Sequence, residues 1–338
     1  MTWEILGSDK LSDWTNWIEQ IPHATVYQQW GWGEFKRGSG CTPLRLVARN
    51  KAGKPVGIAQ VHVYKMLGGF RIVWIPGGPL SLSGSLSSDL IERLHQDLEA
   101  VVGRCYIRCN FMDPVEGASS HNLARYMSRP VVRILSGYSV FLDLEDDENI
   151  WLNKMDSKHR YYIRHSRKNN IEWRYGNDDI NLRSLSGLSE ALVQDKGLKF
   201  DLYNFNQLIQ LRHHLADSVK VIVGYSNGEP ITTAMVLTQS GRGHYSIAAT
   251  TGKGRELSAA YAMLAELRSR LRDDGIRLLD FGGIAPRDKI RRGVDHFKLG
   301  FGGRVVEYLG EWEAGNRFVR FLVNIAVRIR RGGIGGSV

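Results

Sequence analysis

The chain has 338 residues, of which 43% are hydrophobic and 24% charged, and its formal net charge is +10. This length exceeds the roughly 250 residues at which a single hydrophobic core stops growing, so two domains are expected. No apolar run approaches the ~20 residues that span a bilayer, and the opening segment lacks the features of a signal peptide. We therefore expect a cytoplasmic protein whose basic excess favours an anionic partner such as nucleic acid, a nucleotide or an acidic lipid surface.

Cysteine and histidine usage argues against disulfides and metal sites. Cys41, Cys105 and Cys109 are odd in number and form no C-x-x-C pair, and the ten histidines lack metal-ligand spacing. The familiar G-x-S-x-G, H-E-x-x-H and P-loop motifs do not occur either. We expect no structural metal and no bound cofactor.

The first segment that could carry chemistry is QQWGWGEFK, residues 28–36. Its aromatic residues, Trp32 among them, either anchor a helix in the core or face a ligand. Lys36 either meets a phosphate or extends into solvent. The later WIPGGPL, residues 74–80, has two glycines between prolines, which suits a close approach to a ligand and equally a tight connection.

The sequence repeats one pattern in its two halves. Residues 46–63 and 221–238 each contain an apolar strand, a polar turn, Gly-x-Pro-[Val/Ile]-x-x-Ala and a second strand, which predicts a β-hairpin. A third strand, an amphipathic helix and a further strand follow in both halves. The shared order predicts an internal duplication of a mixed sheet with helices on its faces, an α/β or α+β arrangement that resembles the GNAT-like acyltransferase fold.

The densest basic segment is NKMDSKHRYYIRHSRKNNI, residues 153–171. Arg160, Arg164, Arg167 and Lys168 recur at three- and four-residue steps, so on a helix they lie along one side and its shoulder. The segment is either a solvated helix face or a phosphate-binding surface, for which the geometry of arginine is suited.

Residues 278–303, LLDFGGIAPRDKIRRGVDHFKLGFGG, complete the second sheet and end in a glycine-rich stretch. Asp280 lies at the end of a strand, where α/β enzymes often place ligand groups. Lys298 directly follows Phe297 and arrives near the same edge. Because a lysine is costly to bury, its charge is predicted to have a partner.

The C-terminal segment RFVRFLVNIAVRIRR, residues 317–331, predicts a basic amphipathic helix. One face carries Arg317, Arg320, Asn324, Arg328 and Arg331, and the other carries Phe318, Leu322, Ile325 and Ile329. Two interpretations are open: the helix closes on the first domain, or its basic face lies on anionic lipid.

These segments, in this order and spacing, resemble the FemAB/FemX family of non-ribosomal peptidyltransferases, which attach amino acids from aminoacyl-tRNA to the peptide of a cell-wall precursor. The matching motifs are QQWGWGEFK, PGGPL, HRYYIRHSRKNNI, AAYAMLAEL, LDFGGI and DHFKLGFGG. The resemblance implies tandem GNAT-like domains without the coiled-coil arm of FemA-type members. It also implies a chain end that returns to the first domain, which gives residues 1–147 plus 317–338 for the first domain and 148–316 for the second.

The resemblance further implies roles for particular residues. Phe297 and Lys298 match a pair that borders the transfer site, where the lysine assists acyl transfer electrostatically. Tyr261 falls on a motif position and is expected to shape the cleft with Phe297. Lys36 matches the basic residue that binds the diphosphate of the precursor.

Other substrate-binding candidates are assigned more loosely. Trp32 and the basic residues Arg160, Arg164 and Lys168 lie within matching motifs. Lys199 is the nearest candidate for a diphosphate-binding arginine of the second domain. Asp113 is nearest to an aspartate that the family has in the first domain.

The expected function is therefore transfer of an amino acid from aminoacyl-tRNA to an amine of an envelope precursor that carries a diphosphate and is UDP-linked or lipid-linked. We expect a cytoplasmic monomer, with residues 317–331 as a candidate for peripheral membrane contact.

Two alternatives remain open. The first is an acyl-coenzyme A-dependent N-acyltransferase of cell-surface polysaccharide synthesis. Its pyrophosphate loop is incomplete in ATTGKGRELS, residues 249–258, where Ala249 replaces the leading polar residue. The second is a non-catalytic basic module that binds RNA or a membrane surface.

Overall fold

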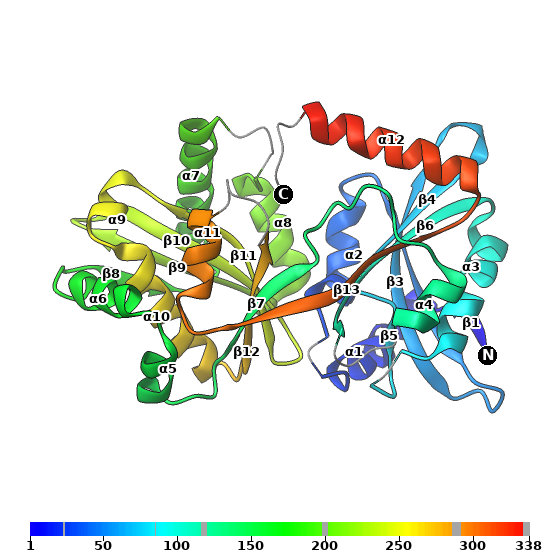
Figure 1. The fold of residues 1–338 in the computed structure, drawn as a ribbon, viewed down its shortest axis with the longest axis horizontal. Helices are drawn as coiled ribbons and strands as arrows, with labels where there is room; N and C mark the ends of the chain where they lie inside the picture. Colours follow the sequence, from blue (N-terminus) through cyan, green and yellow to red (C-terminus); the bar gives the residue numbers. More distant parts are fainter. Residues whose placement is uncertain (23, 85, 116–119, 198–201, 286–291, 334–338) are drawn as a thin grey trace. The chain divides into compact units, whose positions relative to one another are not determined.

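The computed structural model describes residues 1–333 except 23, 85, 116–119, 198–201 and 286–291. It divides into two compact units, of which the first comprises Met1–Gly137 and the residues from Val306 onward, and the second comprises Tyr138–Val305 (Figure 1).

The strands of the first unit are β1 (Thr2–Ile5), β2 (Thr42–Arg49), β3 (Pro55–Lys65), β4 (Arg71–Pro76), β5 (Leu80–Ser81), β6 (Cys105–Pro114) and nearly all of β13 (Arg304–Ala314). Its helices are α1 (Leu11–Glu19), α2 (Trp30–Arg37), α3 (Ser88–Val102), α4 (Ser120–Tyr126) and α12 (Arg317–Gly333), with 3-10 turns at Ser8–Lys10, Val26–Gln28 and Leu67–Gly69.

The strands of the second unit are β7 (Tyr138–Asp143), β8 (Glu172–Tyr175), β9 (Val219–Ser226), β10 (Glu229–Gln239), β11 (Arg242–Thr250) and β12 (Leu278–Ile284). Its helices are α5 (Glu148–Lys154), α6 (Ser157–Ser166), α7 (Asp179–Lys196), α8 (Phe205–Leu215), α9 (Gly252–Glu256), α10 (Ala259–Asp273) and α11 (Arg292–Leu299), with a 3-10 turn at Ala216–Ser218.

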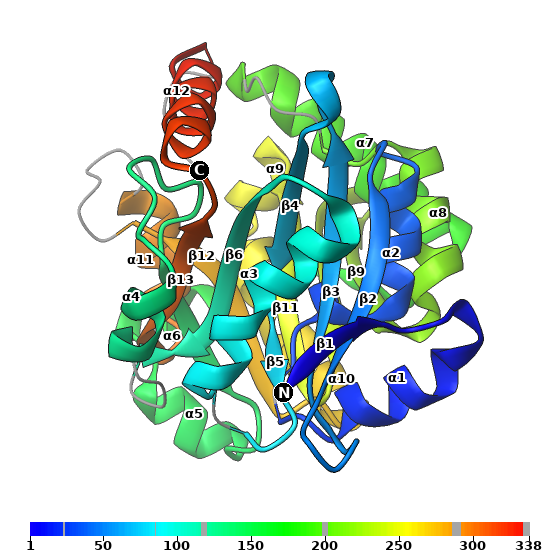
Figure 2. The same ribbon diagram turned by 90° about the vertical axis from the view of Figure 1, so that its right-hand side faces the viewer.

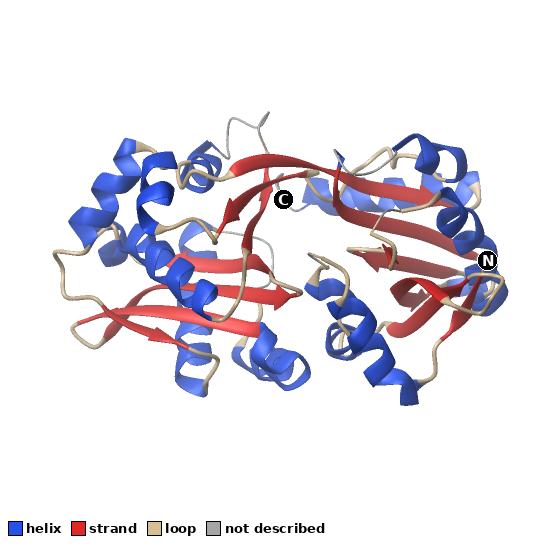
Figure 3. Ribbon diagram, turned by 90° about the horizontal axis from the view of Figure 1, so that it is seen from below, coloured by secondary structure: helices blue, strands red, loops and turns tan. Residues whose placement is uncertain are grey.

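The two units share one sheet topology. Their strand orders are β1-β2-β3-β4-β6-β13 and β8-β9-β10-β11-β12-β7. In each unit a hairpin precedes a third strand, and a helix then leads to a strand parallel to the third: β4 with β6 after α3, and β11 with β12 after α10. Helices lie on both faces of each sheet (Figure 3). The repeat confirms the predicted fold class, a duplicated GNAT-like arrangement of mixed sheets.

The division into units differs from the expected boundaries at 147/148 and 316/317. It falls between Gly137 and Tyr138 and between Val305 and Val306. The strand β7, expected to end the first domain, pairs with β12 in the second sheet, while β13 pairs with β6 in the first. The acidic residues that follow β7 thus mark the end of a strand and not the border of a unit.

Matching glycine turns form the two predicted hairpins. Gly53 and Gly228 have φ values of 76° and 81°, a left-handed conformation that glycine adopts without steric cost. In the first hairpin the side chain of Asn50 accepts hydrogen bonds from the backbone N–H groups of Ala52 and Lys54, both at 3.0 Å. The pattern Gly-x-Pro therefore marks the turn in both halves, as predicted.

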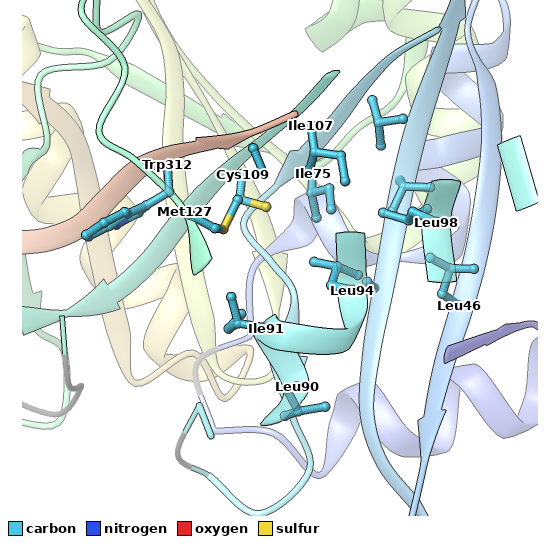
Figure 4. Packing of buried hydrophobic residues seen from close by; sticks show 14 of the residues in the cluster. Leu46, Ile75, Leu90, Ile91, Leu94, Leu98, Ile107, Cys109, Met127 and Trp312 are labelled. Atoms are coloured by element: carbon cyan, nitrogen blue, oxygen red, sulfur yellow. The ribbon is translucent and has the colours of Figure 1, made fainter. Parts of the chain in front are cut away.

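The first sheet is buried on both faces because alternate residues of a strand point to opposite sides. Leu46 of β2 joins Leu94 of α3 in one hydrophobic cluster, part of which Figure 4 shows. Val47, the next residue, packs instead with Trp14 of α1 and Ile58 of β3 in a second cluster. Figure 2 shows α3 in front of the strands of this unit.

The core of the second unit lies between its sheet and α10. Ile222 of β9 and Val236 of β10 pack with Met263 and Leu267 of α10. Ile163 of α6 belongs to the same cluster, so α6 and α10 are held side by side. This places the basic segment of α6 beside the helix that carries Tyr261.

A buried ion pair joins two neighbouring strands of the first unit. Arg108 of β6 and Glu311 of β13 are each 2% exposed, and the Arg108 Nε donates to Glu311 Oε2 at 2.7 Å. The other carboxylate oxygen accepts from the backbone N–H of Ile134 at 2.8 Å. Both charges therefore depend on partners within the protein.

Removing one member of this pair should destabilise the first unit. We expect Arg108→Met to lower the free energy of unfolding by about 3 to 5 kcal/mol, because the Glu311 carboxylate stays buried without its cation. Chemical denaturation followed by circular dichroism measures the change. The control is Arg104→Met, an exposed arginine just before the same strand; equal midpoints for the two variants would contradict the prediction.

Candidate active site

The predicted site residues that the structure describes fall into two groups, one in each unit. Tyr261, Phe297 and Lys298 belong to the second unit, together with the basic residues of α6. Lys36 and Trp32 belong to the first.

A buried histidine holds the second group together. His159 of α6 is fully buried, and its Nε2 lies 3.1 Å from the carbonyl oxygen of Phe297 on α11. The His159 ring also packs edge-on against Tyr261 and Phe301, with centroid distances of 4.9 and 4.8 Å. Burial lowers the pKa of His159 below its ordinary value. The ring therefore stays neutral at neutral pH, and Nε2 carries the proton that the Phe297 carbonyl accepts.

The chain after α11 packs closely against α5 and the start of α6. The indole Nε1 of Trp151 donates to the carbonyl oxygen of Phe301 at 2.9 Å, and the backbone N–H of Asp156 donates to that of Gly300 at 2.8 Å. A Cβ at position 300 would lie 2.1 Å from the His159 ring. The glycine in the motif DHFKLGFGG is thus required by close packing.

Lys298 is half-buried on α11. Its Nζ donates to the carbonyl oxygen of Gly283 on β12 at 2.8 Å. The preceding Phe297 packs edge-on against Tyr261, with centroids 5.2 Å apart. The ammonium is thus held near the end of β12, and the residue before it joins the aromatic packing around Tyr261.

Tyr261 lies between α6 and α11. Its ring centroid is 4.7 Å from that of Tyr162, and burial raises the pKa of its phenol. The group therefore remains a protonated donor at neutral pH.

The basic residues of α6 differ in their surroundings. Arg160 donates through Nη1 to the carbonyl oxygens of Leu152, at 3.0 Å, and Met155, so it holds the turn between α5 and α6. Arg164 and Lys168 are exposed. Exposed Tyr161 and Arg164 lie three residues apart on one face of α6, and Lys168 follows in the turn after the helix ends at Ser166. This face is the part of the segment that a phosphate or a nucleic acid can reach.

Asp280, expected near the ligand edge, lies inside the sheet. Its carboxylate accepts from Arg242 Nη2 at 2.6 Å and from the backbone N–H of Gly282 at 2.9 Å, and His244 Nδ1 lies 3.3 Å away. Burial alone raises a carboxyl pKa, but Arg242 and the hydrogen bonds hold the pKa of Asp280 well below its usual range. The residue is a buried anion of the scaffold.

Lys36 stands at the end of α2 above two aromatic rings. Its Nζ lies 5.1 Å from the ring centroid of buried Trp32 and 5.3 Å from that of Phe35. Burial lowers the pKa of Lys36. The aromatic residues thus form core packing that supports a half-buried cation, which combines both interpretations of this segment.

A buried polar network fixes α2 to the sheet. The Gln28 Nε2 donates to the carbonyl of Pro76 at 2.7 Å, and its Oε1 accepts from the backbone of Gln60 at 2.7 Å. Gln60 in turn accepts from the Arg45 Nε at 3.0 Å. A Cβ at Gly78 would lie 2.8 Å from the Gln28 amide, so the PGGPL motif permits this packing.

Sequence reasoning missed His62 and His159, because neither has a local signature. His62 lies on β3 and is 2% exposed. Burial first, and then the charges of Lys36 and Arg45, lower its pKa to about 4. The imidazole is therefore neutral at physiological pH, and Lys36 and Arg45 carry the positive charge near it.

The remaining predicted residues contribute less. Asp113 is half-buried in β6, and Lys199 lies outside the described residues. The cysteines Cys41, Cys105 and Cys109 are buried free thiols. Across the described part of the chain, no group of three or more His, Cys, Asp or Glu side chains is arranged to hold a metal ion.

Comparison with known proteins defines the class of the molecule as an acyltransferase with a tandem GNAT-like fold. The FemAB family model matches residues 203–323, which confirms the resemblance seen in the motifs and includes Tyr261, Phe297 and Lys298. This finding sets aside a non-catalytic binding module. No curated protein matches the sequence.

Solved structures agree in fold. The crystal structure of FemX covers 96% of this chain and 99% of its own, with a TM-score of 0.80 and 14% identity. The C-terminal domain of a putative lysylphosphatidylglycerol synthetase from Agrobacterium fabrum gives a TM-score of 0.59 at 14% identity, covering 98% and 99%. A tandem GNAT protein from the clavulanic acid biosynthesis pathway gives a TM-score of 0.53 at 12% identity, and the match covers 93% of this chain and 98% of that protein.

The environment of His62 predicts a loss of stability in mild acid. Its folded pKa of about 4 lies below the ordinary value of 6.5, so the unfolded chain takes up the proton first and stability falls as pH drops through 6.5. From pH 8 to pH 5 this residue should contribute a loss of about 2 kcal/mol.

Urea denaturation at both pH values measures this loss. Over the same pH range, the free energy of unfolding of His62→Leu should fall by about 2 kcal/mol less than that of the wild type. The control is His213→Leu, an exposed histidine on α8, which should behave as the wild type. A pH dependence unchanged by His62→Leu would show that this imidazole titrates normally.

Proposed function

We propose that the protein transfers an amino acid from aminoacyl-tRNA to an amine of a peptidoglycan-type cell-wall precursor. The observations that carry the proposal are the ammonium of Lys298, 2.8 Å from the carbonyl oxygen of Gly283, and the packing of the preceding Phe297 against Tyr261. These residues lie in the segment that the FemAB family model matches.

In the proposed reaction, the acceptor amine attacks the carbonyl carbon of the aminoacyl ester. The carbonyl oxygen becomes negatively charged, and Lys298 stabilises it electrostatically. The new amide bond forms as the ester C–O bond breaks; the ribose oxygen leaves with a proton, and the amine loses one to water or substrate. In this proposal the neutral phenol of Tyr261 donates a hydrogen bond to the substrate.

Each unit offers a surface for an anionic substrate. The exposed face of α6 carries Tyr161 and Arg164, and Lys168 follows in the turn after the helix. Together they offer an aromatic ring and two cations, which suits a nucleic acid backbone and its bases. Lys36, a half-buried cation over aromatic rings, suits the diphosphate of a UDP-linked or lipid-linked precursor.

The proposal has consequences for the cell. The enzyme acts as a cytoplasmic monomer without a bound cofactor, since charged tRNA supplies the activated acyl group. Its product contributes to cell-wall biogenesis and so to cell shape. Contact with the inner face of the membrane brings such an enzyme to a lipid-linked acceptor.

Acyl-coenzyme A is the alternative donor, and the short helix α9 before α10 argues against it. At the start of α9 the backbone N–H of Gly254 donates to the hydroxyl of the N-cap residue Thr251 at 3.0 Å. A Cβ at Gly254 would lie 2.3 Å from the carbonyl oxygen of Ile231. Gly254 is thus required by close packing, and its N–H group is already bonded to the N-cap residue. This N–H is therefore not free for a pyrophosphate, which favours aminoacyl-tRNA as the donor.

Substitution of Lys298 tests the proposed chemistry. We expect Lys298→Ala to lower kcat by at least two orders of magnitude, because the removed group stabilises the transition state by about 2.7 to 4 kcal/mol. Single-turnover transfer from charged tRNA measures the rate, and thermal unfolding checks the fold. Lys253→Ala, an exposed lysine on α9, is the control. Near-normal turnover of the folded Lys298 variant would refute the assigned role.

The donor can be identified directly. Mass spectrometry of mixtures that contain candidate amine acceptors with either charged tRNA or acyl-coenzyme A should detect product only with tRNA. Acetyl-coenzyme A should leave the melting temperature unchanged. A clear thermal shift together with acylated product would establish the coenzyme A alternative instead.

A further inference from the structure

The C-terminal helix α12 packs on the first unit through its polar face. Asn324 is 5% exposed; its Nδ2 donates to Glu313 Oε2 at 2.9 Å, and its Oδ1 accepts from the backbone of Val132 at 2.9 Å. Arg320 donates through Nη1 to the Ser128 hydroxyl at 2.7 Å. Of the two interpretations that the sequence left open, these contacts support a helix that closes on the first domain, through Arg320 and Asn324.

The apolar face of α12 is therefore turned outward. Its five large residues are between 39% and 69% exposed, and they are Phe318, Phe321, Leu322, Ile325 and Ile329. Spacings of one, three and four residues place them on one continuous stripe. Nearby Val131 is 87% exposed. A solvent-exposed apolar stripe of this kind marks an interaction site.

A basic groove runs beside the stripe. It has a volume of about 340 Å³ and lies between α12 and the segment 128–132. Arg317 and Arg328, both exposed, line it together with Phe321 and Ile325. Cationic and apolar groups thus lie side by side, as they do where a protein meets the boundary between lipid headgroups and acyl chains.

We propose that α12 docks on a membrane surface that contains anionic lipid. The apolar stripe enters the boundary of the acyl region, while Arg317 and Arg328 meet lipid phosphates. None of the described helices has the length and apolarity to cross a bilayer, so the contact is peripheral. This inference rests on the geometry of α12 alone and does not depend on the proposed reaction.

Charge selects lipid over a second copy of the chain. Residues 317–331 contain five arginines and no acidic residue. A symmetric pairing of two stripes would bring like charges together along the whole helix, which disfavours a dimer. An anionic membrane instead attracts each arginine.

Vesicle flotation tests the proposal with the full chain. We expect the protein to float with vesicles of phosphatidylcholine and phosphatidylglycerol, and much less with phosphatidylcholine alone. Phe318→Ser combined with Phe321→Ser should weaken binding at least tenfold, because both rings are exposed in the free protein and enter the membrane. Arg317→Gln and Arg328→Gln should each weaken binding to the anionic vesicles about fivefold.

The matched control is Ile180→Ser, an exposed apolar residue of α7 in the second unit, which should bind as the wild type. Thermal unfolding of each variant confirms that its fold is intact. Absence of flotation, or equal binding by the double phenylalanine variant, would overturn the proposal. A dimer in sedimentation velocity that the same double variant dissociates, without any vesicle binding, would identify a second copy as the occupant and overturn it too.

Discussion

The arrangement of the second-unit site depends on one buried imidazole. His159 occupies the space that a side chain at position 300 would need, and its Nε2 donates to the carbonyl of Phe297, one residue before Lys298. Burial keeps the ring neutral, and the carbonyl oxygen, which can only accept, selects the tautomer with its proton on Nε2. Since Lys298 is attached to that backbone, the position of its ammonium follows from a histidine that need not touch any substrate.

In the first unit, buried amide side chains fix the backbone that carries Lys36. Gln28 and Gln60 exchange hydrogen bonds between the turn before α2 and the central strand β3, and Arg45 completes the network. Each buried polar group is costly unless paired, so the network specifies one position for the helix that carries Lys36. In both units a lysine with a long, flexible side chain is attached to a backbone held by buried polar contacts.

Features that depend on the local sequence pattern could be predicted. The Gly-x-Pro turns at Gly53 and Gly228 and the repeated order of elements follow from spacing and turn chemistry. Lys36 and Lys298 were singled out through the resemblance of their motifs to a known family. The pairing of β7 with β12 and of β13 with β6 could not be predicted, because strand partners far apart in sequence leave no local mark. Two interpretations of α12 also stayed open, since periodicity separates two faces of a helix but does not say that Asn324 finds a buried carboxylate.

The duplicated topology also bears on the choice of donor. The connection after the third strand is where a GNAT-like fold offers backbone amides to a pyrophosphate, and in each unit one glycine amide there is bonded within the protein. The N–H of Gly77 donates to the carbonyl of Asn110 at 2.8 Å, and that of Gly254 to the hydroxyl of Thr251. An amide that already has a partner must lose it before binding phosphate, which removes most of the gain. A donor bound through cationic side chains, as charged tRNA can be, makes no such demand on these loops.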